Sequence, residues 1–251
     1  MKIVAITQAR YGSTRLPAKI LKEVSGKTLL EIHLERILMS KLVDKLTVAT
    51  TNEIGSEKII SIAQKYNLNT YQGSVNDVLD RFYNAALIES PDYIVRITSD
   101  CPFIDPIVID RVIDVCITSN NDYVSNTLHP TYPDGIDVEV FTFKSLERAY
   151  NEASLKSDRE HVTPYIWKNS SFKGGTIFKS DNVSNEKDYS NYRITVDTLD
   201  DYMVIKALIQ ALGIDKPWID YINYLERNPD IRQINDHYKR NEGYSKSILN
   251  D

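Results

Sequence analysis

The fold of this protein is decided near the start of the chain, where residues 2–19 read KIVAITQARYGSTRLPAK. Residues 2–7 form a short β-branched run, which is typical of a buried strand in a parallel sheet. A polar loop that contains glycine and proline follows over residues 8–27. In open α/β sheets, ligands bind beyond the carboxyl ends of the strands. We therefore expect this loop to lie beside a ligand site.

The alternation of strand and helix continues downstream. Strands are predicted at residues 45–50, 70–71 and 93–98. Helices are predicted at residues 28–40, 57–66, from 76 or 77 to 88, and 106–118. Thr28 is suited to cap the first of these helices and Pro106 to open the last. The order indicates an α/β fold with an open, mostly parallel central sheet and helices on both faces.

After Asp122 the pattern changes and the second half becomes more elaborate. Strands are expected at residues 138–141, 172–178 and 193–196, and helices at residues 199–212 and 218–227. No linker rich in Ser, Gly and Pro divides the chain, so we expect one domain over residues 1–251. Residues 228–251 are rich in Asn, Lys, Asp and Tyr. This composition predicts a surface tail, or an arm that lies on a partner subunit.

The composition excludes several classes of protein. The chain has 251 residues, of which 42% are hydrophobic, and no apolar run approaches the ~18 residues of a membrane-spanning helix. Its N-terminal apolar run is too short for a signal peptide. Cys101 and Cys116 are too few for a disulfide framework and lack metal-ligand spacing. We expect a cytoplasmic protein, and its net charge of −5 disfavours a nucleic-acid partner.

The charge of the first loop is opposite to that of the whole chain. Five basic residues and the single acid Glu23 lie between residues 10 and 27. Gly12 and Ser13 allow the backbone to approach a phosphate, while Arg10, Arg15 and Lys19 supply positive charge. The glycine spacing fits neither a Rossmann fingerprint nor a P-loop. The loop predicts a site for a small anion, and the alternative is a solvated basic loop.

Two acids are placed at the ends of predicted strands. Asp100 follows the strand at residues 93–98, and Asp197 follows the strand at residues 193–196. Magnesium on a nucleotide is commonly held by one or two carboxylates together with phosphate oxygens. The residues alone leave a second interpretation open, in which each aspartate caps the helix that follows it.

The segment Ala9-Arg10-x-Gly-Ser-Thr-Arg-Leu-Pro-x-Lys19 resembles the signature of the cytidylyltransferases that activate acidic sugars, and above all their SpsF-like branch. These enzymes are related to the CMP-ketodeoxyoctulosonate and CMP-sialic acid synthetases. Ala18 stands where the family usually has glycine. The resemblance implies a nucleotide-diphospho-sugar transferase-like three-layer sandwich. It also implies that Arg10 and Lys19 contact the triphosphate of CTP, with Arg15 as a weaker candidate, and that Asp100 and Asp197 bind Mg²⁺.

Three further segments resemble motifs of the same family. Residues 72–81 resemble its nucleotide-recognition segment, although a capped amphipathic helix is an equal alternative for most of these residues. Residues 132–141 and 157–165 resemble its acceptor motifs. The nucleotide-binding residues expected from this resemblance are Ala9, Arg10, Gly12, Ser13, Arg15, Lys19, Gly73, Arg81 and Asp100. The residues expected to bind the sugar are Asp134, Asp137, Glu139, Arg159 and His161, and the histidine has an equal alternative as a helix-surface residue.

The resemblance implies a nucleotidyltransferase that combines CTP with a sugar, expected to be acidic, to give a CMP-sugar and pyrophosphate for surface polysaccharide or glycan synthesis. Arg10, Lys19 and Asp100 are the expected catalytic residues, Mg²⁺ the expected cofactor and a homodimer the expected assembly. One alternative is a glycosyltransferase of the same fold, but Ser99-Asp100-Cys101 supplies only one acid of the Asp-x-Asp motif that such enzymes need. A non-catalytic nucleotide-binding protein is the other alternative.

Overall fold

The computed structural model describes residues 1–13 and 15–251, so Thr14 of the signature segment lies outside the described residues. The strands are Ile3–Gln8 (β1), Glu23–Val24 (β2), Lys27–Thr28 (β3), Lys45–Thr51 (β4), Asn69–Gly73 (β5), Tyr93–Thr98 (β6), Tyr123–Ser125 (β7), Glu139–Thr142 (β8) and Ser180–Asn182 (β9). The α-helices of the first half are Leu29–Leu38 (α1), Ser56–Lys65 (α2), Val78–Glu89 (α3) and Pro106–Thr118 (α4).

The second half contributes shorter helices. Its α-helices are Phe143–Glu152 (α5), Lys156–His161 (α6), Pro164–Lys168 (α7), Leu199–Leu212 (α8), Trp218–Arg227 (α9), Pro229–Arg232 (α10) and Glu242–Ser247 (α11). Single 3₁₀ turns are formed by Lys19–Leu21 (η1), Ser171–Lys173 (η2) and Ile248–Asn250 (η3). Within the described part of the chain, no helix is both long and apolar enough to cross a bilayer.

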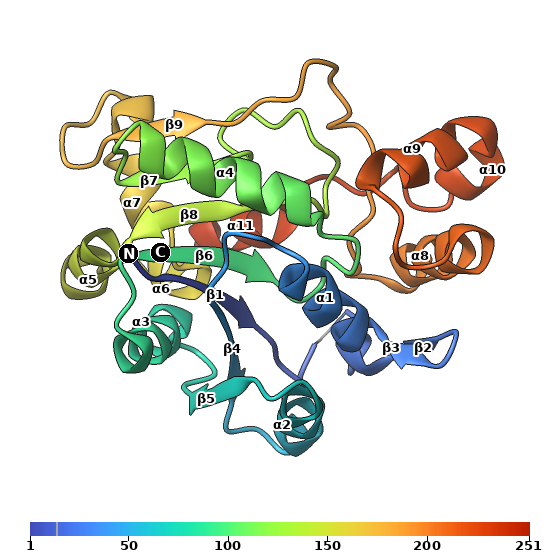
Figure 1. The fold of residues 1–251 in the computed structure, drawn as a ribbon, viewed down its shortest axis with the longest axis horizontal. Helices are drawn as coiled ribbons and strands as arrows, with labels where there is room; N and C mark the ends of the chain where they lie inside the picture. Colours follow the sequence, from blue (N-terminus) through green and yellow to red (C-terminus); the bar gives the residue numbers. More distant parts are fainter. Residues whose placement is uncertain (14) are drawn as a thin grey trace.

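The central sheet has seven strands in the order β5-β4-β1-β6-β8-β7-β9 (Figure 1). The strands β5, β4, β1 and β6 are mutually parallel, β8 is antiparallel to both of its neighbours, and β7 and β9 are parallel. Gln8 at the end of β1 pairs with Thr98 at the end of β6. The register brings the loops after these two strands to one edge of the sheet. The α/β fold with a mostly parallel sheet is therefore confirmed.

Helices cover both faces of the sheet and enclose two hydrophobic cores (Figure 1). The side chains of Ile3 and Ala5 pack in the core formed with α1, α2, α4, α8 and α9. Val4 and Ile6 pack in the core formed with α3, α5 and α7. Because successive side chains of a strand point to opposite faces, β1 is buried on both sides. This double burial explains its uninterrupted apolar run.

Local sequence signals set the helix starts. Thr28 and Glu31 form a capping box at α1, and the Asp77 side chain accepts a hydrogen bond from Asp80 N at the start of α3. Asp105 caps α4, whose first residue is Pro106. These contacts satisfy backbone N–H groups that have no partner within the helix.

Two strand predictions in the second half are wrong. Residues 172–178 contain the end of η2 and a single bridge between Ser170 and Phe178, and residues 193–196 form one bridge, between Asp134 and Arg193. Both segments are apolar enough for a strand, but they run along other segments without a continuous ladder. Residues 228–251, expected to be a tail or an arm, pack against the body of the same chain, where Asn235 and Ser247 are buried.

Candidate active site

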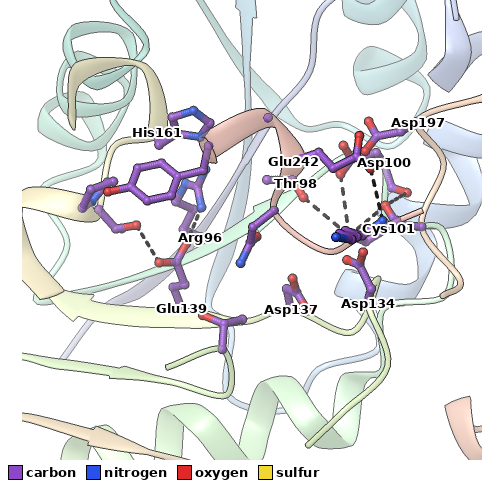
Figure 2. A pocket seen from close by; sticks show the side chains of 18 of the residues that line it. Arg96, Thr98, Asp100, Cys101, Asp134, Asp137, Glu139, His161, Asp197 and Glu242 are labelled. Atoms are coloured by element: carbon purple, nitrogen blue, oxygen red, sulfur yellow. Dashed lines mark hydrogen bonds and ion pairs between the residues drawn. The ribbon is translucent and has the colours of Figure 1, made fainter. Parts of the chain in front are cut away.

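Two adjoining cavities open at the carboxyl ends of β1 and β6. The larger cavity has a volume of about 720 Å³ and the smaller cavity about 410 Å³. Their shared boundary is formed by Arg15, Arg96, Thr98, Asp100, His161, Asp197 and Gly243, all of which line both cavities. In Figure 2, Asp100 and Asp197 lie toward one end of the smaller cavity, and Arg96 and His161 lie toward the other. The arrangement suits two ligands that meet at the two aspartates.

A lysine lies between the two aspartates. Lys19 Nζ is 2.9 Å from Asp100 Oδ2 and 2.8 Å from Asp197 Oδ1, and Arg15 is 2.8 Å from the same Asp197 oxygen. Burial by itself would lower the pKa of Lys19, but the two carboxylates raise it above its usual value. Burial also works to raise the pKa of Asp100, yet the Lys19 ammonium holds that pKa well below its usual range. Lys19 and Asp100 are therefore both charged at neutral pH.

The backbone fixes the position of each member of this cluster. Val196 N and Thr195 Oγ1 both donate to Asp100 O, at 2.8 Å and 3.0 Å, which ties the two aspartate-bearing segments together. Lys19 begins η1 directly after Ala18, whose φ of 52° lies in the left-handed region. Glycine adopts this conformation without steric cost. The geometry thus explains why this position of the signature favours glycine.

A divalent cation fits these residues. Within residues 1–13 and 15–251, no group of three or more His, Cys, Asp or Glu side chains is arranged to hold a metal. Asp100 and Asp197 nevertheless converge on one cation, the Lys19 ammonium, and carboxylate oxygens are the ligands that Mg²⁺ prefers. A metal at these two acids would complete its coordination with oxygens from a phosphate ligand and from water.

Arg193 organises the acids behind the cluster and was not identified from the sequence. Its guanidinium contacts Asp134, Asp197 and the fully buried Asp201. Asp201 accepts hydrogen bonds from Arg193 and forms a capping box with Thr198. The signal in the sequence was an arginine directly before the apolar run of residues 194–196. Nothing in its spacing showed that three acids would surround it.

Several of the expected nucleotide-binding residues line the larger cavity. These are Ala9, Arg10, Ser13, Arg15, Lys19, Arg81 and Asp100. Burial and the neighbouring Arg10 lower the pKa of Arg81 to about 10, so the guanidinium stays protonated at neutral pH. Arg81 also donates to the backbone oxygen of Ser74. The first loop and the start of α3 therefore converge on one cavity, although the loop ends at residue 27 and α3 begins at Val78.

Gly12 and Gly73, two expected nucleotide contacts, are not among the residues that line either cavity. A Cβ at Gly12 would lie 2.6 Å from Glu53 Oε1, and one at Gly73 would lie 3.0 Å from Arg81 Cγ. The structure thus gives both glycines a packing role, and Gly73 leaves room for the Arg81 side chain. Direct contact of these two glycines with the nucleotide stays a prediction.

The expected sugar-binding acids line the smaller cavity (Figure 2). Asp134 pairs with Arg193 and Asp137 with Arg240. Burial and the neighbouring Asp137 raise the pKa of Asp134, and burial raises that of Asp137. Gly135 stands between them with φ 110°, where a Cβ would lie 2.7 Å from the backbone of Ile194. The close approach of these two segments therefore requires glycine.

Glu139 and His161 also lie in the smaller cavity. Glu139 pairs with Arg96 and accepts hydrogen bonds from Tyr123 Oη and Thr163 Oγ1, both at 2.6 Å, so its carboxylate is held rigidly. His161 Nε2 lies 3.0 Å from Ser247 Oγ. Burial and the neighbouring Arg96 lower the pKa of His161, so the imidazole is neutral at pH 7.

Arg159 does not lie where the sequence analysis expected it. It lines the larger cavity, and its Nε donates to Asp77 Oδ2 at 2.7 Å. Its Nη1 reaches the backbone oxygens of Tyr150 and Ala153, each at 3.2 Å. The guanidinium thereby joins the starts of α3 and α6 to the end of α5. The structure thus places Arg159 at the larger cavity, apart from the other residues expected to bind the sugar, and its expected contact with a sugar carboxylate stays a prediction.

The C-terminal segment forms one wall of the smaller cavity. Tyr238, Lys239, Asn241, Glu242, Gly243 and Tyr244 all line it. Arg240 anchors this segment to Asp137 and to the backbone oxygen of Tyr132, and Ser247 anchors it to His161 and Glu160. Because this segment is polar and its apolar residues follow no helical or strand period, the sequence gives no signal that it lines a cavity.

Comparisons with known proteins agree with this geometry. A family model described as Cytidylyltransferase matches residues 4–241. The spore coat polysaccharide biosynthesis protein SpsF of Bacillus subtilis is 33% identical over 236 residues, which cover 91% of this chain and 95% of SpsF. A 3-deoxy-manno-octulosonate cytidylyltransferase of Elusimicrobium minutum is 26% identical over 84% of this chain and 91% of its own length.

A solved cytidylyltransferase structure from Leptospira borgpetersenii superposes with a TM-score of 0.87 at 36% sequence identity, covering 95% of this chain and all of that one. The match extends over both halves of the molecule, including the elaborated second half. The chain therefore belongs to the cytidylyltransferase family, in an SpsF-like branch related to the 3-deoxy-manno-octulosonate enzymes, and it is a nucleotidyltransferase of nucleotide-diphospho-sugar transferase-like fold.

Proposed function

We propose that this protein transfers the cytidylyl group of CTP to a hydroxyl group of a sugar, with release of pyrophosphate. The observation that carries the proposal is the pair of cavities that meet at Asp100 and Asp197, with Lys19 between the acids. The larger cavity takes CTP and the smaller cavity takes the sugar. Two substrates bound in this way meet at the boundary, where attack on the α-phosphate requires them to be in contact.

The basic side chains of the larger cavity bind the triphosphate. Arg10, Arg15 and Lys19 line it, and each offers N–H donors to phosphate oxygens. As the α–β bond breaks, negative charge grows on the β-phosphate, and fixed cations near that group stabilise it. Lys19 is the residue best held for this role, because two carboxylates keep it protonated and oriented.

Asp100 and Asp197 are the residues that would hold Mg²⁺ together with the nucleotide. A divalent cation supplies positive charge that stabilises phosphate oxygens and favours deprotonation of a nearby hydroxyl group. The acids themselves keep this charge at the boundary between the cavities, where both substrates meet. With a cation at the two acids, the Lys19 ammonium would exchange its contacts with the carboxylates for contacts with phosphate oxygens.

The smaller cavity has the chemistry of a carbohydrate site. Asp134, Asp137 and Glu139 offer carboxylates to hydroxyl groups, and the rings of Trp167 and Tyr244 line the same cavity. An acidic sugar also needs a cation. Lys173 and Lys239 line the cavity, and no carboxylate pairs with either side chain within residues 1–13 and 15–251. We propose these two lysines as partners of the sugar carboxylate.

Release of pyrophosphate tests the proposal. The protein is incubated with Mg²⁺, each of the four ribonucleoside triphosphates and a panel of acidic sugars that includes 3-deoxy-manno-octulosonate. We expect pyrophosphate only when CTP and one of the sugars are both present, with a CMP-sugar as the second product. Transfer of a sugar from a nucleotide-sugar donor, without pyrophosphate release, would instead identify a glycosyltransferase and refute the proposal.

The assembly and location of the protein stay predictions. We propose a homodimer, which sedimentation velocity would detect as a species of about twice the 28.8 kDa chain mass. A cytoplasmic location is consistent with a CTP-using enzyme of sugar activation, and fractionation of the cells that make the protein tests it.

A further inference from the structure

Arg193 contacts three carboxylates that belong to different parts of the molecule. Its Nε and Nη2 donate to the two oxygens of Asp201, at 2.8 Å and 3.0 Å. Nη2 also donates to Asp197 Oδ2 at 3.3 Å, and Nη1 donates to Asp134 Oδ2 at 2.5 Å. Because a guanidinium is planar and rigid, these bonds fix the three acids relative to one another. One side chain therefore joins an expected metal ligand, Asp197, to an expected sugar ligand, Asp134.

Asp201 supports the guanidinium from behind. Its side chain is fully buried, and it is not among the residues that line either cavity. Its carboxylate also accepts hydrogen bonds from Asp197 N at 2.9 Å, Thr198 N at 3.0 Å and Asn235 Nδ2 at 2.9 Å. Paired side-on contacts between arginine and a carboxylate are strong and geometrically specific. Asp201 is thus a fixed support, and the remaining donors of Arg193 are directed at acids that line the cavities.

The contacts of Asp197 divide its two carboxylate oxygens. Oδ2 accepts from Arg193, whereas Oδ1 lies 2.8 Å from Lys19 Nζ and 2.8 Å from an Arg15 nitrogen. Rotation of the carboxylate would break the contact with Arg193. The guanidinium therefore keeps Oδ1 on the side of Lys19, where the metal is expected.

Asp134 and Asp197 lie at the same end of the smaller cavity (Figure 2). We propose that Arg193, supported by Asp201, is a positioning residue for the transfer reaction. It turns Asp197 Oδ1 toward the metal and holds the Asp134 carboxylate at the wall of the sugar cavity. This inference rests on the proposed function, in which Asp197 holds Mg²⁺ and the smaller cavity binds the sugar. Replacing a residue that orients a metal ligand commonly lowers metal affinity or activity by roughly 10–100-fold.

Arg240 provides a contrast within the same cavity. It pairs with Asp137 and donates to the backbone oxygen of Tyr132 at 3.0 Å. Both partners belong to the segment expected to bind the sugar. Loss of the Arg240 guanidinium is therefore expected to disturb the sugar site alone, whereas loss of the Arg193 guanidinium disturbs the sugar site and the metal site together.

Calorimetric titration with CTP tests the metal side of this proposal without knowledge of the sugar. CTP is titrated in excess Mg²⁺ and again in EDTA, and the ratio of the two affinities is the magnesium gain. Arg193→Lys keeps the charge, but an ammonium is unable to replace the planar fork that contacts three acids. We expect the magnesium gain of Arg193→Lys to fall about tenfold, toward that of Asp197→Asn. Arg240→Lys is expected to keep the magnesium gain of the unaltered protein.

Arg36→Lys is the matched control for loss of a buried arginine. The Arg36 side chain is 4% exposed, against 8% for Arg193, and it donates to the backbone oxygens of Ile104 and Ile214. Arg36 is not among the residues that line either cavity. We expect Arg36→Lys to lower the unfolding free energy in urea without changing the magnesium gain. A merely structural role of Arg193 would give the same result for Arg193→Lys.

The pyrophosphate assay supplies the sugar side. With a sugar that supports pyrophosphate release, Arg193→Lys should raise both the KM for the sugar and the Mg²⁺ concentration that gives half-maximal rate. Arg240→Lys should raise the KM for the sugar alone. If both variants change the Mg²⁺ requirement equally, the effect is a general one of cavity charge and the special role of Arg193 is refuted.

The remaining outcomes also decide the question. An unchanged magnesium gain in Arg193→Lys refutes the inference and leaves the proposed function standing. Asp201→Asn removes the support of Arg193 at nearly constant volume, so it should lower the magnesium gain as well. This second variant decides the matter if Arg193→Lys does not fold. Equal CTP affinity of the unaltered protein with and without Mg²⁺ overturns the inference together with the metal site, and failure to bind CTP at all refutes the proposed function itself.

Discussion

Replacing Lys19 with methionine removes the cation that joins Asp100 to Asp197. Its Nζ lies 2.9 Å and 2.8 Å from the two carboxylates, and the side chains are 15%, 24% and 20% exposed in the order Lys19, Asp100, Asp197. Loss of one partner from a buried ion pair costs roughly 3–5 kcal/mol. Both acids keep some contact with water, and Arg15 still pairs with Asp197. We therefore expect the lower end, a loss of about 3 kcal/mol in unfolding free energy.

Urea unfolding at pH 7 measures this loss, with Lys206→Met as the control because Lys206 is exposed on α8. Magnesium gives a second readout. Without the Lys19 ammonium, the two acids are open to a divalent cation, and a ligand at 100 times its dissociation constant restores about 2.7 kcal/mol. Magnesium should thus stabilise Lys19→Met more than the unaltered protein. The added substitution Asp197→Asn should abolish this gain.

The dependence on pH has a definite sign. The pKa of Asp100 is held below its usual value in the folded state by Lys19, so its contribution to stability is present above pH 4 and is lost as the pH falls. In Lys19→Met this part of the acid dependence should disappear. The reasoning that Lys19, Asp100 and Asp197 form one electrostatic unit would be refuted by two results together. These are a urea midpoint for Lys19→Met equal to that of Lys206→Met, and no response of Lys19→Met to magnesium.

Three further predictions concern the same region. Asp100→Asn and Asp197→Asn should each lower turnover by about 10²–10³-fold in the pyrophosphate assay while the circular dichroism spectrum is retained, and near-normal turnover in either variant would remove that acid from the reaction. His33 is fully buried between Thr7 Oγ1 and Cys101 O, and burial lowers its pKa to about 4. Because the unfolded chain takes up a proton near pH 6.5 and the folded chain does not, roughly 3 kcal/mol of stability should be lost between pH 6.5 and pH 4, and His33→Gln should show a shallower loss. Ala18→Gly should raise the unfolding free energy by about 0.5–1 kcal/mol, since it relieves the left-handed conformation at φ 52°, and a lower melting temperature would contradict this account.

The sequence by itself determined the first half of the molecule. The local signals are the β-branched run of β1, the caps at Thr28 and Asp77, the start of α4 at Pro106, and the order of strands and helices. The structure confirms each of them. Local signals are sufficient there because β1 is buried on both faces and the helices α1, α3 and α4 begin at capped turns. The positions of Asp100 after β6 and of the basic loop after β1 were likewise predictable, since parallel strands bring their carboxyl ends to one edge.

The second half was decided by contacts between distant segments. Residues 172–178 and 193–196 have strand-like composition but gain only single bridges, because ladder formation depends on a partner that sequence patterning does not reveal. The position of the Arg159 side chain depended on the acid that lies beside it in the folded chain. That acid is Asp77, which is 82 residues away in the sequence. Buried charged side chains are paired with opposite charges, but the type of a charged residue does not indicate which residue will be its partner.

The C-terminal segment shows the same limit. Its polar composition indicated a tail, yet Arg240 reaches Asp137 across 103 residues and the segment forms a wall of the smaller cavity. Periodicity and capping are short-range properties of a chain, whereas cavities and ion pairs are created by the closure of long loops. For this reason the sequence located the site, and only the tertiary structure decided which side chains line it.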